Sequence, residues 1–153
     1  MSEQFSFISA RWPRAKPPKR AEVLALLDRV IPWGELEERL RPFYAADSRR
    51  TGRKGYSLKM MVRCWVLACV WMLSDEGLEN FILDSLAAAK FIGTDPWQPR
   101  PPSASAFRNF RHIVERRLGL DLRLAIDLAF INAGLQWRQG RVLDPVFRRA
   151  SQK

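Results

Sequence analysis

One segment of the sequence, from Ser103 to Leu118, carries polar and basic side chains at the spacing of a helix surface. The candidates for contact with a nucleic acid are Ser103, Ser105, Arg108, Asn109, Arg111 and His112. Arginine can donate to O6 and N7 of guanine, asparagine can pair with N6 and N7 of adenine, and serine can bind phosphate. The segment therefore has the chemistry of a helix that enters the major groove, although an ordinary amphipathic surface helix has the same spacing.

A basic stretch with the sequence DSRRTGRKG supplies a second set of candidates. Its cations are Arg49, Arg50, Arg53 and Lys54, which could clamp phosphate groups of DNA or form a solvated loop. The stretch lacks the glycine spacing and the Lys-Ser/Thr pair of a nucleotide-binding P-loop. A nucleotide site is therefore not expected there, and both the phosphate clamp and the solvated loop stay open.

Asp144 is the candidate for metal chemistry, because it follows a short apolar segment, Arg141–Asp144, that could start a strand. A carboxylate at a strand end can be a magnesium ligand in a two-metal nuclease, but one carboxylate binds magnesium weakly. The chain has one histidine, His112, and no CxxC motif, which argues against a zinc site and against a Ser-His-Asp triad. We expect no cofactor for this chain by itself.

The positive charge is concentrated in four blocks of the chain, residues 1–20, 49–63, 100–117 and 138–153. They hold 21 of the 26 basic residues and 3 of the 16 acidic ones, and the net charge of the whole chain is +10. Solvated surface lysines and arginines would be mixed more evenly with acids. The pattern favours double-stranded DNA as the partner.

The elements that must position these residues are helical. Apolar periodicity predicts six helices, which begin near Ala21, after Pro32 and at Leu58, Asp75, Ser103 and Asp121. The apolar stretch Met60–Leu73 is too short for a membrane span and contains Arg63, so it predicts a central buried helix in a cytoplasmic protein. Cys64 and Cys69, five residues apart, are expected to stay reduced.

The predicted fold is therefore all-α, a compact bundle of about six helices with a short unpaired C-terminal strand. The fourth helix, expected over 75–90, forms with the fifth a helix-turn-helix-like unit, although the connection is long for that motif. We divide the chain into a basic arm (1–20), a helical DNA-binding domain (21–135) and the start of a second domain (136–153).

Several stretches, in this order, resemble the DDE transposases of bacterial insertion sequences that carry an InsH-type N-terminal domain. They are Ile31-Pro32-Trp33, Tyr56 to Arg63 with Leu73-Ser74-Asp75, Lys90-Phe91-Ile92-Gly93, Phe107 to His112, and Gly140 to Asp144 followed by Ala150 to Lys153. The resemblance implies that residues 21–135 recognise terminal inverted repeats. It also implies that Asp144 is the first aspartate of a triad that holds two divalent ions, Mg²⁺ in this family, on an RNase H-like fold.

The resemblance covers the family's N-terminal part and the first catalytic aspartate, so we expect a truncated form that binds DNA and does not cut it unaided. Pro145 and the pair Arg148-Arg149 depart from the family's small or apolar residues there. Two other functions stay open, a stand-alone regulator that blocks the repeats and a protein-interaction module. The candidate partners are double-stranded DNA, a second copy of the chain and a full-length transposase.

Overall fold

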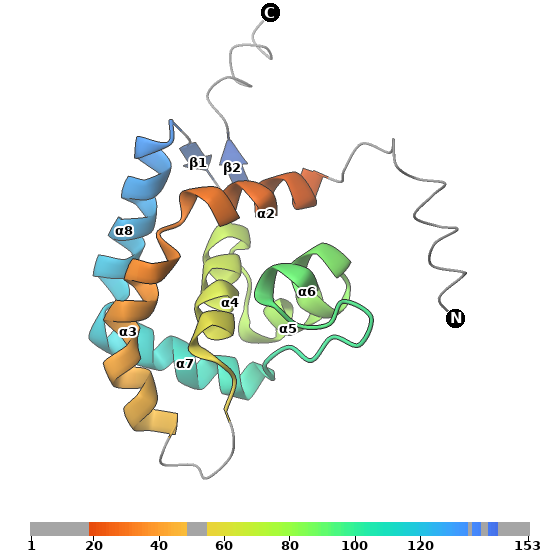
Figure 1. Ribbon diagram of the computed structural model, residues 1–153, viewed down its shortest axis with the longest axis vertical. Helices are drawn as coiled ribbons and strands as arrows, with labels where there is room; N and C mark the ends of the chain where they lie inside the picture. Colours follow the sequence, from red (N-terminus) through yellow and green to blue (C-terminus); the bar gives the residue numbers. More distant parts are fainter. Residues whose placement is uncertain (1–18, 49–54, 135, 139–140, 144–153) are drawn as a thin grey trace, which may run out of the picture.

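A computed structural model describes residues 19–48, 55–134, 136–138 and 141–143 of the chain. Its helices and strands are α2 (Lys19–Val30), α3 (Trp33–Ser48), α4 (Leu58–Trp71), α5 (Asp75–Leu83), α6 (Leu86–Ile92), α7 (Ala104–Arg117), α8 (Gly119–Asn132), β1 (Gln136–Arg138) and β2 (Arg141–Leu143). Figure 1 shows the other helices arranged around α4. The predicted all-α bundle is confirmed.

Helix α4 is the centre of the bundle because nearly its whole circumference is apolar. It begins at the N-cap Ser57, whose hydroxyl accepts a hydrogen bond from the amide of Met60 at 3.2 Å. Its buried side chains are Met61, Val62, Cys64, Trp65, Val66, Leu67 and Val70. Helices α3, α5, α6 and α7 all contact it. The prediction of a central helix from Leu58 is confirmed.

The expected fourth helix is divided in two, which is the main difference from the predicted elements. Helix α5 ends at Leu83, and Ser85 then adopts an extended conformation as the N-cap of α6. The Ser85 hydroxyl accepts a hydrogen bond from the amide of Ala88 at 3.2 Å. Serine can occur inside a helix. Here, however, its hydroxyl hydrogen-bonds to a backbone amide of the following turn and so starts a new helix. The connection between α5 and α7 therefore contains α6 and the loop after it.

Arg63 of α4 joins three helices at one edge of the core. Its guanidinium donates to Asp28 of α2 at 2.6 Å and to the carbonyl of Phe91 of α6 at 3.0 Å. It also lies 4.4 Å from the ring centroid of Trp33 in α3. Only 15% of the side chain is exposed, and its positive charge is compensated by these partners within the fold. This arginine of the second basic block is thus a structural residue.

The C-terminal strand predicted to begin at Arg141 is present as β2, but it is paired. It forms an antiparallel two-stranded sheet with β1, in which Trp137 lies opposite Val142. The expectation of an unpaired strand was wrong because β1 follows the Gly134 turn too closely, and is too short, to show a strand pattern of its own. Helix α8 ends before that turn.

The thiols of α4 are both free, as the five-residue spacing predicts. Burial raises the pKa of Cys64 to about 12, and burial is also the main reason that the pKa of Cys69 is raised to about 11. Neither thiol is therefore a nucleophile at neutral pH. Among the described residues, no helix has both the length and the apolar character needed to cross a membrane.

Candidate nucleic-acid interface on helix α7

Helix α7 is strongly amphipathic, and its inner face anchors it to the core. Its N-cap is Ser103, whose hydroxyl accepts a hydrogen bond from the amide of Ala106 at 3.2 Å. The inward side chains, spaced by three and four residues, are Phe107, Phe110, Ile113 and Val114, all buried. The ring of Tyr44 on α3 meets Phe110 edge to face, 5.7 Å between centroids. These contacts fix which face of α7 points outward.

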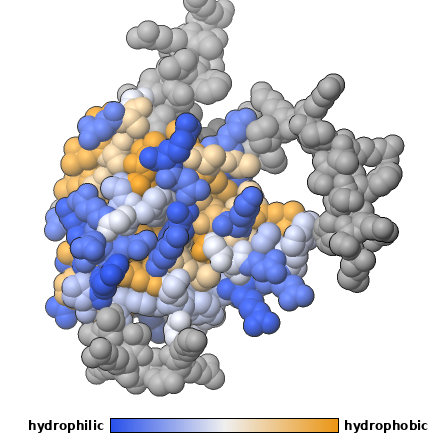
Figure 2. Space-filling view, in the orientation of Figure 1, coloured by the Kyte–Doolittle hydropathy of each residue, from blue (hydrophilic) through white to orange (hydrophobic). Residues whose placement is uncertain are grey.

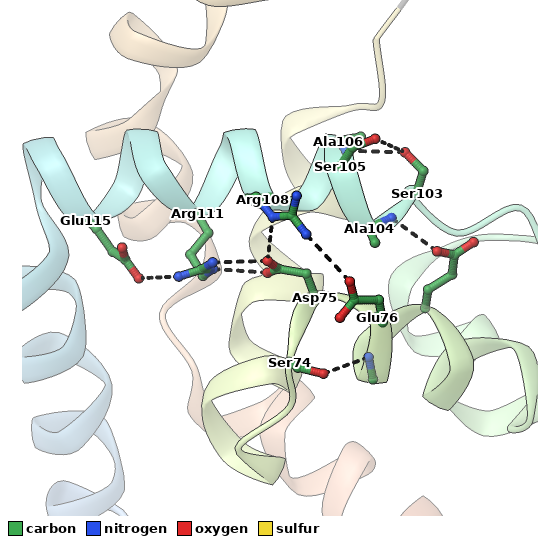
Figure 3. Close-up of polar contacts among 12 residues, drawn as sticks. Ser74, Asp75, Glu76, Ser103, Ala104, Ser105, Ala106, Arg108, Arg111 and Glu115 are labelled. Atoms are coloured by element: carbon green, nitrogen blue, oxygen red, sulfur yellow. Dashed lines mark hydrogen bonds and ion pairs between the residues drawn. The ribbon is translucent and has the colours of Figure 1, made fainter.

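A buried carboxylate at the start of α5 holds the flank of α7. Arg111 donates from Nε to Oδ1 of Asp75 and from Nη2 to Oδ2, both at 3.0 Å. Arg108 donates from Nε to Oδ2 of the same carboxylate at 3.1 Å. Figure 3 shows both arginines converging on Asp75, which is 8% exposed. A bidentate ion pair of this kind fixes both the position of a helix and its rotation about its axis.

Three further carboxylates form polar contacts with residues of α7. Arg111 also donates from Nη1 to Glu115 at 3.1 Å, and Arg108 lies 3.6 Å from Glu76. At the helix start, Glu79 accepts a hydrogen bond from the amide of Ala104 at 3.1 Å, and a carboxylate there favours the positive end of the helix. The α5 helix thus contacts α7 through polar groups from its first turn onward (Figure 3).

The charges of this cluster stabilise one another. The hydrogen bond from Arg111 holds the pKa of Asp75 below its ordinary value, against the opposing effect of burial, and Arg108 lowers it further. The same hydrogen bond raises the pKa of Arg111. Asp75 is therefore ionised at neutral pH, and part of the positive charge of both arginines is already neutralised within the fold.

The outward face of α7 carries polar and basic side chains in one stripe. The exposed members are Ser105, Arg108, Asn109, His112 and Arg116. In the part of the chain that the structure describes, the side chains of Asn109 and His112 have no hydrogen-bond partner. Arg116 donates from Nε to the carbonyl of His112 at 3.3 Å, one turn away. The stripe can therefore offer amide, imidazole, hydroxyl and guanidinium groups to a ligand.

The structure brings together only part of the predicted site. Ser103, Ser105, Arg108, Asn109, Arg111 and His112 all belong to α7 or its cap, as the sequence predicts. Ser103 is engaged as the cap, and Arg108 and Arg111 are engaged by Asp75. The remaining candidates, Arg49, Arg50, Arg53, Lys54 and Asp144, lie outside the described residues.

Asp75 is the site residue that sequence reasoning missed. From the sequence it is one of three acids at a helix start, which explains it as a partner of the helix dipole. Its bonds to α7 could be predicted only by knowing that α5 packs against α7. No sequence pattern within either helix indicates that packing. Arg116 was also missed, although it lies four residues after His112 on the same face.

Among the described residues, the histidine, cysteine, aspartate and glutamate side chains form no group of three that could hold a metal ion. The geometry defines a helical bundle followed by a short two-stranded sheet, in which α7 is held by Asp75 and presents a polar and basic face.

Comparison with known proteins gives the family. The model of a transposase domain, DUF772, matches residues 13–113, about two thirds of the chain. The chain belongs to this transposase-domain family, which associates it with DNA transposition and, in general terms, with DNA. No curated protein and no solved structure matches it significantly. The matched segment contains α2 to α6 and most of α7.

Proposed function

We propose that the helical domain binds double-stranded DNA at the terminal inverted repeats of an insertion sequence through the outward face of α7. The observation that carries the proposal is the exposed stripe of Ser105, Asn109, His112 and Arg116 on a helix fixed by a buried carboxylate. A recognition helix needs a rigid attachment and free hydrogen-bonding groups on one side. Family membership supports DNA as the ligand.

The members of the stripe differ in what they can recognise. Asn109 can pair with the N6 and N7 of an adenine, which gives sequence preference. Ser105 lies in the first turn of α7 and Arg116 in the last, so both are suited to phosphate contacts on either side of the groove. His112 lies between Asn109 and Arg116 and can donate or accept at a base edge. Arg108, whose side chain is 47% exposed, can reach DNA and keep its bond to Asp75.

Arg111 has a different role in this proposal. Its side chain makes two hydrogen bonds to Asp75 and one to Glu115, so its donors are largely occupied. We infer that Arg111 is a positioning residue that sets the angle of α7. The basic stretch Arg49, Arg50, Arg53 and Lys54, outside the described residues, is proposed to contact the phosphate backbone.

The catalytic assignment is also a proposal, and it rests on the resemblance to DDE transposases of the InsH-type group. Asp144 is the proposed first aspartate of the triad. A two-metal site of this type needs further carboxylates. We therefore propose that strand cleavage requires Asp144 together with the remaining carboxylates of the triad.

Electrophoretic retardation and fluorescence anisotropy test the proposal, with labelled duplexes from the ends of the element that encodes the chain. We expect tighter binding to these duplexes than to scrambled ones. Asn109→Ala should cost roughly 1–3 kcal/mol on the native duplex and little on the scrambled one, because a base contact is lost. Arg116→Ala should weaken both equally, since phosphate contacts carry no sequence information.

Arg41→Ala is the matched control, because it removes one exposed arginine from α3 instead of α7. It should change the affinity less than Arg116→Ala does. If native and scrambled duplexes are retarded equally, the claim of repeat recognition is wrong. If neither α7 substitution changes binding while the fold is intact, α7 is not the DNA-binding helix.

A further inference from the structure

Helix α8 has a second apolar face that the fold leaves in solvent. Leu122, Ile126 and Phe130 point into the core. On another side of the same helix, Leu124, Leu128 and Ile131 are 49%, 57% and 66% exposed. Their spacing of four and three residues places them in one ridge. Figure 2 shows hydrophobic surface over α8 at the upper left of the molecule.

A groove runs beside this ridge. It has a volume of about 710 Å³ and lies between α8 and the junction of α2 with α3. Apolar groups form much of its lining, among them Val30, Pro32 and Ala129. The ridge residue Leu128 is part of its wall. Helices pack on one another by placing a ridge of side chains into a groove of the partner. This face has an apolar ridge next to a partly apolar groove.

The charges at this groove are balanced, unlike those of the chain as a whole. Its lining includes Arg29 and Arg39 together with Glu35 and Asp121. Arg39 is paired with Glu35 at 2.6 Å, whereas Arg29 and Asp121 have no ion pair among the described residues. A DNA-binding surface would be positive throughout. A balanced, apolar patch in a chain of net charge +10 is instead where two copies repel each other least.

We propose that a second copy of this chain docks on this face, α8 against α8 in antiparallel fashion about a twofold axis. In such an interface the same patch serves both partners, so it must contain both a ridge and a groove and both signs of charge. The ridge of Leu124, Leu128 and Ile131 in one copy occupies the groove of the other. Arg29 and Asp121 then each meet an opposite charge across the axis. The proposal is independent of DNA binding.

Sedimentation velocity and light scattering on the 153-residue chain, without DNA, test this pairing. The wild type should pass from monomer to dimer as its concentration rises. Leu128→Glu places a charge in the centre of the ridge and should weaken association at least tenfold. Leu86→Glu is the matched control, because Leu86 is equally exposed, 55%, but lies on α6. It should associate like the wild type, and circular dichroism should show all three proteins folded.

The charge pair gives a second, independent measurement. Arg29→Glu and Asp121→Arg should each weaken the dimer, and the two together should restore it, because the charges across the axis are then exchanged. A wild-type chain that stays monomeric at every concentration overturns the proposal, since another protein or another segment must then cover α8. Equal loss of association in Leu128→Glu and Leu86→Glu overturns it as well. Lack of DNA binding in these samples would have no bearing on either result.

Discussion

Helices α7 and α8 follow one another in the chain, have 14 residues each, and bury one side in the same core, yet their outward sides differ. The outer face of α7 carries Ser105, Asn109 and His112, and the outer face of α8 carries Leu124 and Leu128. Both helices are thus anchored alike and offer opposite chemistry to a partner. The polar face suits a hydrated polyanion and the apolar face suits protein.

The two helices also differ in how their positions are fixed. Helix α7 begins at a serine cap and is tied to Asp75 through Arg108 and Arg111. Helix α8 begins after Leu118 with no side-chain cap. A helix that must place hydrogen-bonding groups against base edges needs a set rotation, whereas an apolar ridge tolerates small shifts. The polar attachments of α7 thus fit the function proposed for its outer face.

The largest expected effect is a difference in stability between a substitution on the inner face and one on the outer face of these helices. Phe110→Ala removes a ring that is 1% exposed and should lower the free energy of unfolding by about 3–5 kcal/mol. Leu128→Ala, at a dilution where the chain is monomeric, should change it by less than about 0.5 kcal/mol, because that side chain is in solvent. Urea denaturation followed by circular dichroism measures both. Equal losses would mean that the α8 ridge is part of the core.

The next effect distinguishes the two arginines of α7. Arg111→Ala should cost about 3 kcal/mol of stability, because it leaves the buried Asp75 without its two-pronged partner. Arg108→Ala should cost about 1 kcal/mol, because that side chain is 47% exposed and makes one hydrogen bond to Asp75. The same denaturation measurement compares them. The reverse order would remove Arg111 from its positioning role.

How far the sequence led can be judged from these same helices. The predicted helix starts at Leu58, Asp75 and Ser103 agree within one residue with those of α4, α5 and α7, each of which follows a serine N-cap. These signals are local, because caps and periodicity act within one turn or two. Ser85 shows the limit of such signals, since its capping of α6 could not be told from a helix interior.

Tertiary partners could not be predicted in the same way. The hydrogen bonds between Asp75 and Arg111 join residues that are 36 positions apart. The packing of α5 against α7 that creates them produces no periodic pattern in the sequence. The exposure of Leu124 and Leu128 was equally hidden, because α8 is apolar on several sides and the pattern does not say which side meets the core. Sequence thus indicated the elements and their outward chemistry more reliably than their attachments.

Acid should weaken the attachment of α7 selectively. The pKa of Asp75 is lowered by its arginine partners, so the carboxylate's contribution to stability is complete above its ordinary value of 3.8 and is lost as the pH falls below it. The stability difference between wild type and Asp75→Asn should therefore be largest at neutral pH and shrink on acidification. Denaturation curves at several pH values measure this difference.

Glu38→Gln serves as the control for that measurement, because Glu38 is exposed on α3 and has no ion pair among the described residues. Its stability difference from the wild type should stay small across the same pH range. A difference for Asp75→Asn that does not depend on pH would show that the carboxylate acts through packing and not through its charge.

The smallest effect concerns the start of α7, where the two helices contrast most simply. Ser103→Ala removes the hydroxyl that accepts from the amide of Ala106 and should cost about 1 kcal/mol. Ser105→Ala, two residues later, removes an exposed hydroxyl that caps nothing and should cost less. Thermal denaturation ranks the two variants. If Ser105→Ala proves the more destabilising, the contact between the two hydroxyls stabilises the start of α7 more than the cap does. The difference between a capped α7 and an uncapped α8 would then not explain how α7 is held.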